Sequence, residues 1–251
     1  MAQTKGVIVT PDYEMRPGDG AYYKGLRIQA HPEVHVHIAK RLVELYPRGA
    51  RVLDVASGTG SLAQRLLDSG FEVHCTTWND KLRVDAPTYR LDLDQPFQSR
   101  DVGDVVFDVI VASEIIEHIE NPSSFLRSCA STLTRNGLLI VTTPNVAYVV
   151  SRLQWLRRGY PSSFAREEVV HNRHISMIWQ IGFEHIAQAA GLCLNETRYM
   201  GGNRSGLPTY KRFICNALVK ALGPTASGAS CVFLLSRSPD GSHPHSSEAT
   251  Y

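Results

Sequence analysis

The sequence predicts an α/β fold in which a mainly parallel β-sheet carries helices on both faces. From Ala50 onward, short apolar runs alternate with amphipathic stretches, a pattern typical of βαβ units. The runs at 107–113 and 138–142 are almost wholly apolar rather than alternating, so we expect two central strands that are covered on both sides. A glycine-rich turn at 56–60 lies between the first strand and the helix after it.

Seven segments are predicted to be strands of this sheet. Each is a short run bounded by turn residues, and the last two lie near the end of the chain. We expect the strands at residues 51–57, 71–78, 88–94, 106–113, 138–145, 194–201 and 230–238.

The amphipathic stretches around these strands predict helices. We expect them at residues 31–49, 60–70, 123–137, 146–159 and 178–191. The second helix ends at Gly70, and the third has Asn121 and Pro122 at its start and Gly137 at its end, which are common helix boundary residues.

The chain divides into three parts. Residues 1–30, rich in Gly, Pro and Tyr, predict an N-terminal cap or flap, and residues 31–237 form the single α/β domain. Residues 238–251 are polar and contain Pro and Gly, so we expect a disordered tail.

Composition and charge exclude several classes of protein. The formal net charge of +2 gives no reason to expect a stable nucleic-acid partner. The cysteines are scattered singly, without metal-binding pairs or the dense spacing of a secreted disulfide scaffold, so we expect them to be reduced. The N-terminus lacks the apolar core of a signal peptide, and no apolar run approaches the ~20 residues of a membrane helix. We therefore expect a cytoplasmic protein, and nothing in these residues predicts its oligomeric state.

The turn Ala56-Ser57-Gly58-Thr59-Gly60 is the first candidate for a binding site. Glycines at this position let the backbone approach a ligand and turn tightly into the next helix. Asp54 lies just before the turn, inside the first strand, where a buried carboxylate is costly unless it has hydrogen-bonding partners. This combination predicts a ligand crevice at the carboxyl end of the first strand.

The run VLDVASGTG resembles the first motif of class I S-adenosylmethionine (SAM) dependent methyltransferases, E/DxGxGxG. Asp54, Ala56, Gly58 and Gly60 occupy the four motif positions, and Ala56 replaces the first glycine. The resemblance extends over roughly residues 40–195, through LDLD, FDVIVASEIIEHIENP, LTRNGLLIVTTPN and RHIS. It implies the Rossmann-like methyltransferase fold and SAM as the cofactor.

The resemblance also implies roles for individual residues. Gly58 and Gly60 would border the methionine part of SAM, and Asp92 and Leu93 would meet its adenine. Further residues expected to line the SAM pocket are Asp54, Ala56, Ser57, Ser113 and Glu114.

The sequence departs from the family at the end of the second strand. The acidic residue that would bind both ribose hydroxyls falls close to Thr77, a weaker substitute. Asp80 or Asn79 would reach the ribose if the loop bends, and a solvated turn is the alternative for Asp80.

An NAD-dependent enzyme is the rival interpretation of the glycine-rich turn. Its G-x-G-x-x-G fingerprint would place a third glycine at position 63, where Ala63 is an allowed variant, and the usual acidic residue after the second strand is missing. We therefore favour SAM.

Glu114, Glu117 and His118 form the pattern ExxEH directly after the fourth strand. On a helical turn these positions share one face, so we expect the three side chains to converge at the mouth of the crevice. Methyl transfer to a hydroxyl requires in-line positioning and removal of a proton, and His118, assisted by Glu117, is the natural base.

The same residues also suit a divalent cation such as Mg²⁺, which would lower the pKa of a bound hydroxyl. His174 is the first candidate for a fourth ligand and His171 the second. ExxEH followed by a distant His resembles the ubiquinone-biosynthesis O-methyltransferases and the small-RNA terminal 2′-O-methyltransferases, in which such residues are associated with a metal. A metal site at Glu114, Glu117, His118 and His174, a metal-free His118 base, and purely structural roles all stay open.

Two histidine- or arginine-rich helices have simpler interpretations. His35 and His37 would point to different sides of the first helix, and we expect both to be solvated. The basic helix with Arg157 and Arg158 suits an anionic acceptor or peripheral contact with a membrane surface, whereas a surface helix that packs Leu153 is the simpler alternative.

These observations together predict a SAM-dependent O-methyltransferase. A small-molecule, glycan or lipid-linked hydroxyl is the expected acceptor, with a sugar hydroxyl ahead of a phenol or quinol. The alternatives are a metal-dependent RNA 2′-O-methyltransferase and a non-catalytic partner protein that retains the fold.

Overall fold

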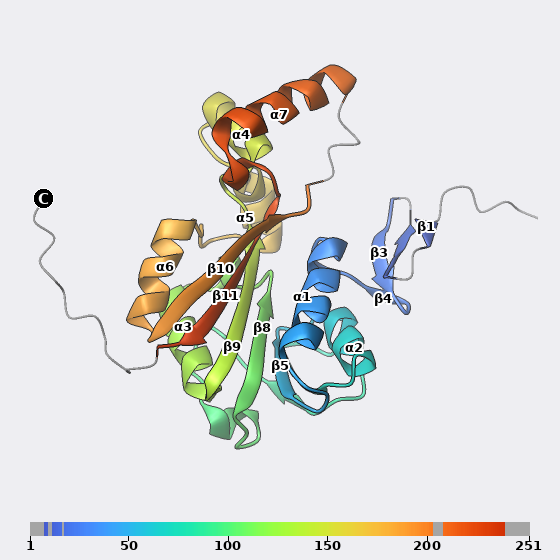
Figure 1. Cartoon of the computed structure of the whole chain (residues 1–251), viewed down its shortest axis with the longest axis vertical. Coiled ribbons are helices and arrows are strands. Elements are labelled where there is room, and N and C mark those ends of the chain that lie inside the picture. The colour runs from blue at the N-terminus through green and yellow to red at the C-terminus, as the bar shows by residue number, and fades with distance from the viewer. Residues whose placement is uncertain (1–7, 10–11, 17, 203–207, 239–251) are drawn as a thin grey trace, which may run out of the picture.

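A computed structural model describes residues 8–9, 12–16, 18–202 and 208–238 of the 251-residue chain. Its main sheet has the strand order β10-β11-β9-β8-β5-β6-β7 (Figure 1). The strands are β5 (Arg51–Val55), β6 (Glu72–Thr77), β7 (Thr88–Arg90), β8 (Phe107–Ser113), β9 (Leu133–Pro144), β10 (Leu192–Met200) and β11 (Ser230–Arg237). The predicted seven-stranded sheet is confirmed.

The pairing of the strands is mainly parallel, as expected. β5 pairs in parallel with β6 and β8, β6 with β7, and β8 with β9, whereas β11 runs antiparallel to both β9 and β10. The chain builds the sheet outward from β5 to β7 and then returns to the other side of β5 at β8. This reversal opens a crevice at the carboxyl ends of β5 and β8, which is where ligands bind in open α/β sheets.

Helices cover both faces of the sheet. On one face lie α1 (Pro32–Leu45) and α2 (Ser61–Asp68), and on the other α3 (Pro122–Thr132) and α6 (Gln180–Ala189) (Figure 1). Alternate residues of β8 pack against the two helix layers: Val109 and Val111 pack with α1 and α2, whereas Ile110 packs with α3 and α6. Burial on two sides explains the continuous apolar run, and the prediction of central strands is confirmed.

The third helix is shorter than predicted. It begins as expected, with Asn121 Oδ1 accepting a hydrogen bond from the backbone of Ser124. It ends at Thr132 rather than at Gly137, because Leu133 is buried in the core and already pairs with Phe107 as the first residue of β9. The prediction of a helix over 123–137 is wrong in its last turn.

A helical lobe stands beyond the carboxyl end of the sheet. It consists of α4 (Val149–Arg158), part of a predicted helix, and α7 (Thr209–Leu222), which was not predicted (Figure 1). The two helices share a small core of their own, built on Tyr148, Val149, Cys215 and Ala226. A second unpredicted helix, α5 (Arg166–Asn172), lies between this lobe and the sheet. The described residues also contain four short 3₁₀ turns: η1 (Ser99–Val102), η2 (Ile116–His118), η3 (Ser162–Phe164) and η4 (Pro224–Ala226).

The N-terminal residues form a separate small antiparallel sheet. Its strands are β1 (Ile8–Val9), β2 (Glu14–Arg16), β3 (Gly20–Tyr23) and β4 (Leu26–Arg27). This sheet contacts α2, where the Tyr23 hydroxyl donates to Asp68 and the Arg65 guanidinium lies 3.9 Å from the Tyr23 ring. A role as cap or flap stays a prediction. Of the predicted tail, residues 239–251 lie outside the described residues.

Two further expectations concern the whole chain. None of the five cysteines is in a disulfide, and four of them are buried, whereas the expectation that they are reduced stays a prediction. Among the described residues, no helix combines the length and apolar character that crossing a membrane requires.

Candidate functional site

The turn between β5 and α2 has the backbone that a close-fitting loop requires. Ala56, Gly58 and Gly60 all have positive φ, at 57°, 58° and 91°. A side chain on Gly58 would overlap the Gln29 amide, and one on Gly60 would overlap Val84. The loop is fastened to β6, since the Ala56 amide donates to Thr76 Oγ1 over 2.9 Å. Ala56 adopts the left-handed conformation although it is not glycine, which identifies a strained position in this loop.

Asp54 is buried at the end of β5, as its position in the strand predicts. Its Oδ2 atom has no hydrogen-bond partner, and burial raises the pKa of the carboxyl to about 7. Beside it lies a small cavity of about 30 Å³ that is also lined by Ser57, Ser113 and His35. An unpaired buried oxygen next to a polar cavity suits a ligand group that donates a hydrogen bond.

His35 is buried, so the prediction that it is solvated is wrong. Only 5% of its surface is exposed. It faces the sheet on the same side of α1 as the apolar residues Val34, Ile38 and Leu42. Burial, and then the nearby Arg65 charge, lower its pKa to about 3.

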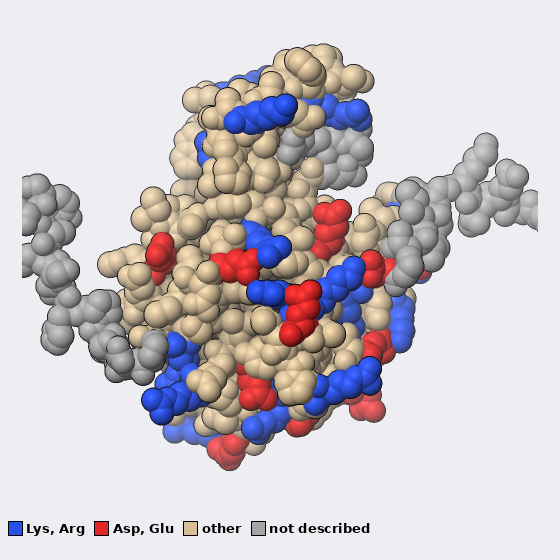
Figure 2. All heavy atoms as spheres, viewed as in Figure 1, with Lys and Arg blue, Asp and Glu red and all other residues tan. Residues whose placement is uncertain are grey.

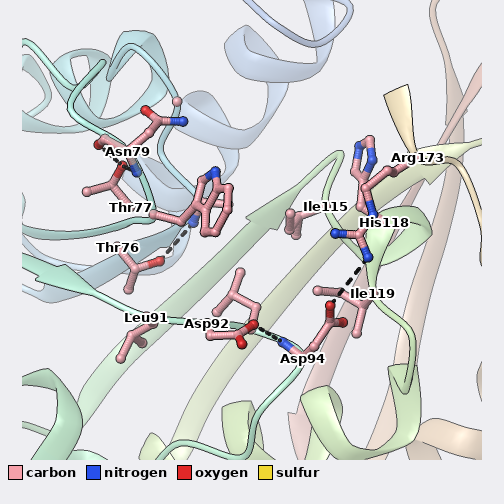
Figure 3. Close-up of a pocket in the computed structure, with 14 residues that line it drawn as sticks. Thr76, Thr77, Asn79, Leu91, Asp92, Asp94, Ile115, His118, Ile119 and Arg173 are labelled. Atoms are coloured by element: carbon pink, nitrogen blue, oxygen red, sulfur yellow. Dashed lines mark hydrogen bonds and ion pairs between the residues drawn. The ribbon is translucent and has the colours of Figure 1, made fainter. Parts of the chain in front are cut away.

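A pocket of about 260 Å³ opens at the carboxyl ends of β5 to β8 (Figure 3). We call it the strand-end pocket. Of the residues predicted to bind the cofactor, Ala56, Gly58, Asp92 and Leu93 line it. One side is closed by Arg173, whose guanidinium and the carboxylate of Asp94 point toward one another, 3.7 Å apart (Figure 3).

Thr77, Asn79 and Asp80 are the residues predicted to replace the acidic ribose ligand at the end of β6, and two of them line the strand-end pocket. Thr77 lines the strand-end pocket, but its hydroxyl donates to the backbone oxygen of Asn79 over 2.7 Å. Asn79 lines the pocket as well (Figure 3). Asp80 does not: its side chain is 96% exposed and pairs with Arg90. The structure therefore does not bring Asp80 to the pocket, because the loop turns its carboxylate toward solvent.

A second, larger cavity of about 770 Å³ adjoins the first. We call it the acceptor-side cavity. Its wall is mostly polar and combines residues before α1, the segment after β8, and α5 with its following loop; among them are Arg27, Gln29, Glu168, His171 and Asn172. The two cavities share Ala56, Gly58, Ile115 and His118. Groups bound in the two cavities would therefore meet beside His118.

The ExxEH segment does not lie on one continuous helical face. Glu114 has a φ of 50°, and the short η2 turn begins only at Ile116. The Glu114 carboxylate accepts a hydrogen bond from the Thr142 hydroxyl over 2.9 Å, and burial raises its pKa to about 7. The predicted common face is wrong for Glu114, because a left-handed residue after β8 turns it toward β9.

The other three predicted residues do come together. Glu117, His118 and His174 each offer an atom within 4.8 Å of the others. Glu117 is 1% exposed, and neither of its carboxylate oxygens has a hydrogen-bond partner. Burial and the neighbouring Glu114 raise the pKa of Glu117 well above its usual value, whereas burial and then the nearby His174 lower the pKa of His118. His171 lines the same cavity but is not part of this cluster.

His174 is held in place in the loop after α5. The Nδ1 atom of His174 lies 2.6 Å from the backbone oxygen of Ser163. Since a carbonyl only accepts, Nδ1 carries a proton, and in the neutral ring this leaves the lone pair on Nε2. The next two residues, Ile175 and Ser176, both donate backbone hydrogen bonds to the Glu117 carbonyl. A histidine oriented through one nitrogen with the other available is the arrangement common among metal ligands.

The cluster has the donor set of a cation site. One carboxylate and two imidazoles suit first-row transition cations such as Mn²⁺, Fe²⁺ or Zn²⁺ better than Mg²⁺, which prefers oxygen ligands. The two carboxylate oxygens of buried Glu117 have no hydrogen-bond partner, as expected of a ligand whose cation is not present. These residues therefore fit a divalent cation.

A sequence profile of a methyltransferase domain family matches residues 29–196, well over half of the chain. The chain belongs to this methyltransferase family. The match contains the loop after β5, the strand-end pocket and the cluster of Glu117, His118 and His174, so all of them lie within the family domain.

Curated relatives are O-methyltransferases. A ubiquinone biosynthesis O-methyltransferase of Caulobacter sp. (strain K31) is 32% identical in an alignment 105 positions long, which covers 39% of this chain and 42% of that protein. The enzyme of the same name from Bradyrhizobium diazoefficiens is 32% identical in an alignment 130 positions long, which covers 44% of this chain and 50% of that protein. The chain thus spans about half the length of the curated relatives it matches.

Solved structures share the fold at low sequence identity. Magnesium protoporphyrin IX methyltransferase from Synechocystis matches with a TM-score of 0.56 and 16% identity, over 82% of this chain and 83% of that one. A SAM-dependent methyltransferase from Archaeoglobus fulgidus matches with a TM-score of 0.55 and 13% identity, over 80% and 93% of the two chains. The predicted class I methyltransferase fold is confirmed.

Sequence reasoning missed several residues of this methyltransferase site. Trp78 and Arg173 line the strand-end pocket, and Gln29 lies over the glycine loop. Trp78 had a usable signal, since it is an aromatic residue directly after a strand that ends at the ligand edge. Arg173 and Gln29 had none, because their positions depend on loops that only the fold brings together.

Proposed function

We propose that this methyltransferase-family chain transfers a methyl group from SAM to a hydroxyl of a small-molecule, glycan or lipid-linked acceptor. The observation that carries the proposal is the junction of the two cavities at His118. A donor in the strand-end pocket and an acceptor in the larger cavity would meet beside a side chain able to take a proton. In-line positioning and proton removal are the two requirements of hydroxyl methylation.

The residues of the strand-end pocket fit SAM. A Cβ on Gly58 would overlap the Gln29 amide, so this position requires glycine, and its positive φ suits the loop that would hold the methionine part. In the small cavity that shares Ala56 with this pocket, the buried, unpaired Oδ2 of Asp54 would bind a hydrogen-bond donor of the cofactor. Asp92 and Leu93 would contact the adenine, and Asn79 with Thr77 would take the place of the missing acid at the ribose.

The chemistry is assigned to the cluster of Glu117, His118 and His174. When bound, a divalent cation would lower the pKa of the acceptor hydroxyl. Glu117 would supply the carboxylate ligand and His174 an oriented imidazole, while Ser163 keeps that imidazole in the ligating tautomer. The alternative is a metal-free site in which His118, kept neutral by burial, removes the proton itself.

The polar wall of the acceptor-side cavity supports a hydroxyl-rich acceptor. Arg27, Glu168 and Asn172 offer charged and amide groups that suit a sugar. The names of the curated relatives support a small molecule and a transfer to oxygen, and they keep a phenol or quinol as the second candidate. The cytoplasmic location expected from the sequence stays a prediction.

Calorimetry with SAM and its demethylated product tests the cofactor. We expect binding by the wild type and weaker binding by Gly58→Val, whereas Arg100→Ala, an exposed change on η1, should bind as the wild type does. No binding by the wild type at millimolar ligand would overturn the proposal. Labelled methyl transfer to a panel of sugars, phenols and RNA would then identify the acceptor class.

A further inference from the structure

The helical lobe of α4 and α7 exposes bulky apolar side chains. Leu156 on α4 is 86% exposed and Phe213 on α7 is 75% exposed. Other large apolar residues of the lobe that are at least two fifths exposed are Leu153, Trp155, Tyr210, Ile214 and Leu222. The shared core of the two helices is too small to cover these side chains, so the lobe presents an uncovered apolar surface.

The charge of the lobe has one sign. Neither α4 nor α7 contains Asp or Glu. Arg157, Arg158, Arg212 and Lys220 are exposed on it, and Figure 2 shows blue but no red among the atoms of this lobe on the face in view. Arg152 is different, because it donates to the backbone of Ala147 and to Thr225 inside the lobe. The exposed cations thus have no acidic partner on their own helices.

The apolar and basic groups are interleaved. A groove of about 520 Å³ runs between the two helices, with Leu153, Tyr210 and Ile214 in its walls and Arg157 and Arg158 among its lining residues. Helices with bulky apolar residues on one side and Lys or Arg beside them lie in the interface of anionic membranes, where the apolar groups enter the acyl boundary and the cations meet phosphates.

The lobe is also placed suitably relative to the candidate site. It stands beyond the carboxyl edge of the sheet (Figure 1). α4 leads through η3 into α5, and α5 supplies Glu168 and His171 to the acceptor-side cavity. A surface that meets the lobe would therefore lie at the edge of the molecule where the cavity is.

We propose that the helical lobe docks on the surface of an anionic lipid bilayer. A second copy of this chain is a poorer occupant, because a two-fold contact through the lobe would set Arg157 and Arg158 against another surface without acidic groups on α4 or α7. The proposal does not depend on methyl transfer.

Vesicle co-sedimentation tests the proposal. The full chain is mixed with vesicles of pure phosphatidylcholine or of equal parts phosphatidylcholine and phosphatidylglycerol, at low and at high salt. We expect it to sediment with the anionic vesicles at low salt only, since exposed cations attract anionic lipid and salt screens them. Equal recovery in the supernatant with both vesicle types would overturn the proposal.

Matched variants separate the lobe from the rest of the surface. Arg157→Glu with Arg158→Glu should lower the partition coefficient by at least about tenfold, and Leu156→Glu with Phe213→Glu should also weaken binding. Controls are Arg100→Glu on η1 and Ile181→Glu on α6, where Ile181 is 78% exposed. Equal losses in the lobe and control variants would contradict the proposal. Unchanged binding of SAM's demethylated product by the lobe variants would show that they are folded. It would also show that their loss of vesicle binding does not result from a change in the cofactor site.

The fluorescence of Trp155 provides a second test, which detects contact of the lobe with the vesicle directly and does not depend on a variant that binds more weakly. Trp155 is 43% exposed on α4. In a protein with Trp78→Phe and Trp179→Phe, we expect its fluorescence to shift to shorter wavelength when anionic vesicles are added. An unshifted spectrum under conditions of sedimentation would place the contact elsewhere and overturn the proposal. A dimer in light scattering that Leu156→Glu dissolves, without vesicle binding, would identify a second copy as the occupant instead.

Discussion

His118 and His174 meet edge to face, with their ring centroids 4.8 Å apart, although one follows β8 and the other follows α5. The contact exists because the backbone after His174 is hydrogen-bonded to the carbonyl of Glu117. The loop after α5 and the turn after β8 therefore form one unit, and the proposed cation site depends on both.

The first prediction concerns this cation site. We expect the wild type to bind Mn²⁺ and His174→Ala to bind it at least about tenfold more weakly, because an oriented imidazole is lost. The matched control is His171→Ala, since His171 lines the same cavity outside the cluster. Titration followed by electron paramagnetic resonance measures free Mn²⁺ directly. Equal affinities for both variants, or methyl transfer that survives chelator and His174→Ala alike, would favour the metal-free His118 base.

The second prediction concerns the strained residue of the glycine loop. Ala56 has a φ of 57°, which glycine adopts at no steric cost. Ala56→Gly should raise the free energy of unfolding by roughly 0.5–1 kcal/mol. Glycine relieves the strain in the folded protein, and the greater conformational entropy that it gives the unfolded chain offsets part of this gain. Ala63→Gly, inside α2, should instead lower the free energy of unfolding by about 1 kcal/mol. Urea denaturation measures both, and a destabilised Ala56→Gly would show that Ala56 is not strained.

The third prediction concerns the pH dependence that buried His35 introduces. Its pKa is about 3 in the folded protein and 6.5 in the unfolded chain, so below pH 6.5 the unfolded chain takes up a proton that the folded protein does not. Stability from this group is therefore full above pH 6.5 and falls as the pH drops toward 3, by about 2 kcal/mol between pH 7 and 5.

Asp54 acts in the opposite direction. Its raised pKa of about 7 means that the folded protein gains stability from this carboxyl as the pH falls below 7. The informative quantity is therefore the difference between the wild type and His35→Gln, which should shrink on acidification. Urea denaturation at pH 7 and pH 5 measures it; parallel pH profiles for the two proteins would be incompatible with a buried, neutral His35.

The fourth prediction concerns the core under α6. Phe183 is 1% exposed and stacks on Phe233 of β11, with the ring centroids 4.2 Å apart. Phe183→Ala should cost about 3–5 kcal/mol, because it removes this stacking and leaves a cavity. Ile181→Ala on the same helix removes an exposed side chain and should stay within about 0.5 kcal/mol of the wild type. Similar losses for both variants would mean that α6 is packed differently.

Sequence patterns predicted the sheet well for a physical reason. Central parallel strands such as β8 are buried on both faces, and this requirement leaves a continuous apolar run in the sequence. α7 was not predicted because many of its apolar residues are exposed. The spacing of its apolar residues therefore does not show the regular pattern of a helix that packs one face on the main core. The end of α3 was not predicted because Leu133 is equally apolar in a helix and in a strand.

The candidate site was predictable to a similar extent. Glu117, His118 and His174 were recognised from their residue types, and the fold brings them together. Glu114 was misplaced because the spacing in ExxEH does not encode its left-handed backbone. The orientation of Asp80 and the closure by Arg173 depend on loop geometry, which residue types alone do not determine.

The position of β11 has a consequence for how the protein is made. This strand is the last described element of the chain, yet it lies inside the sheet between β9 and β10. During synthesis β9 and β10 leave the ribosome first, and the backbone groups that pair with β11 lack this partner until residues 230–237 have been synthesised. A nascent chain halted before Ser230 would lack Phe233 and the strand that joins the two edges, and would be a target for chaperones and proteases until translation resumed.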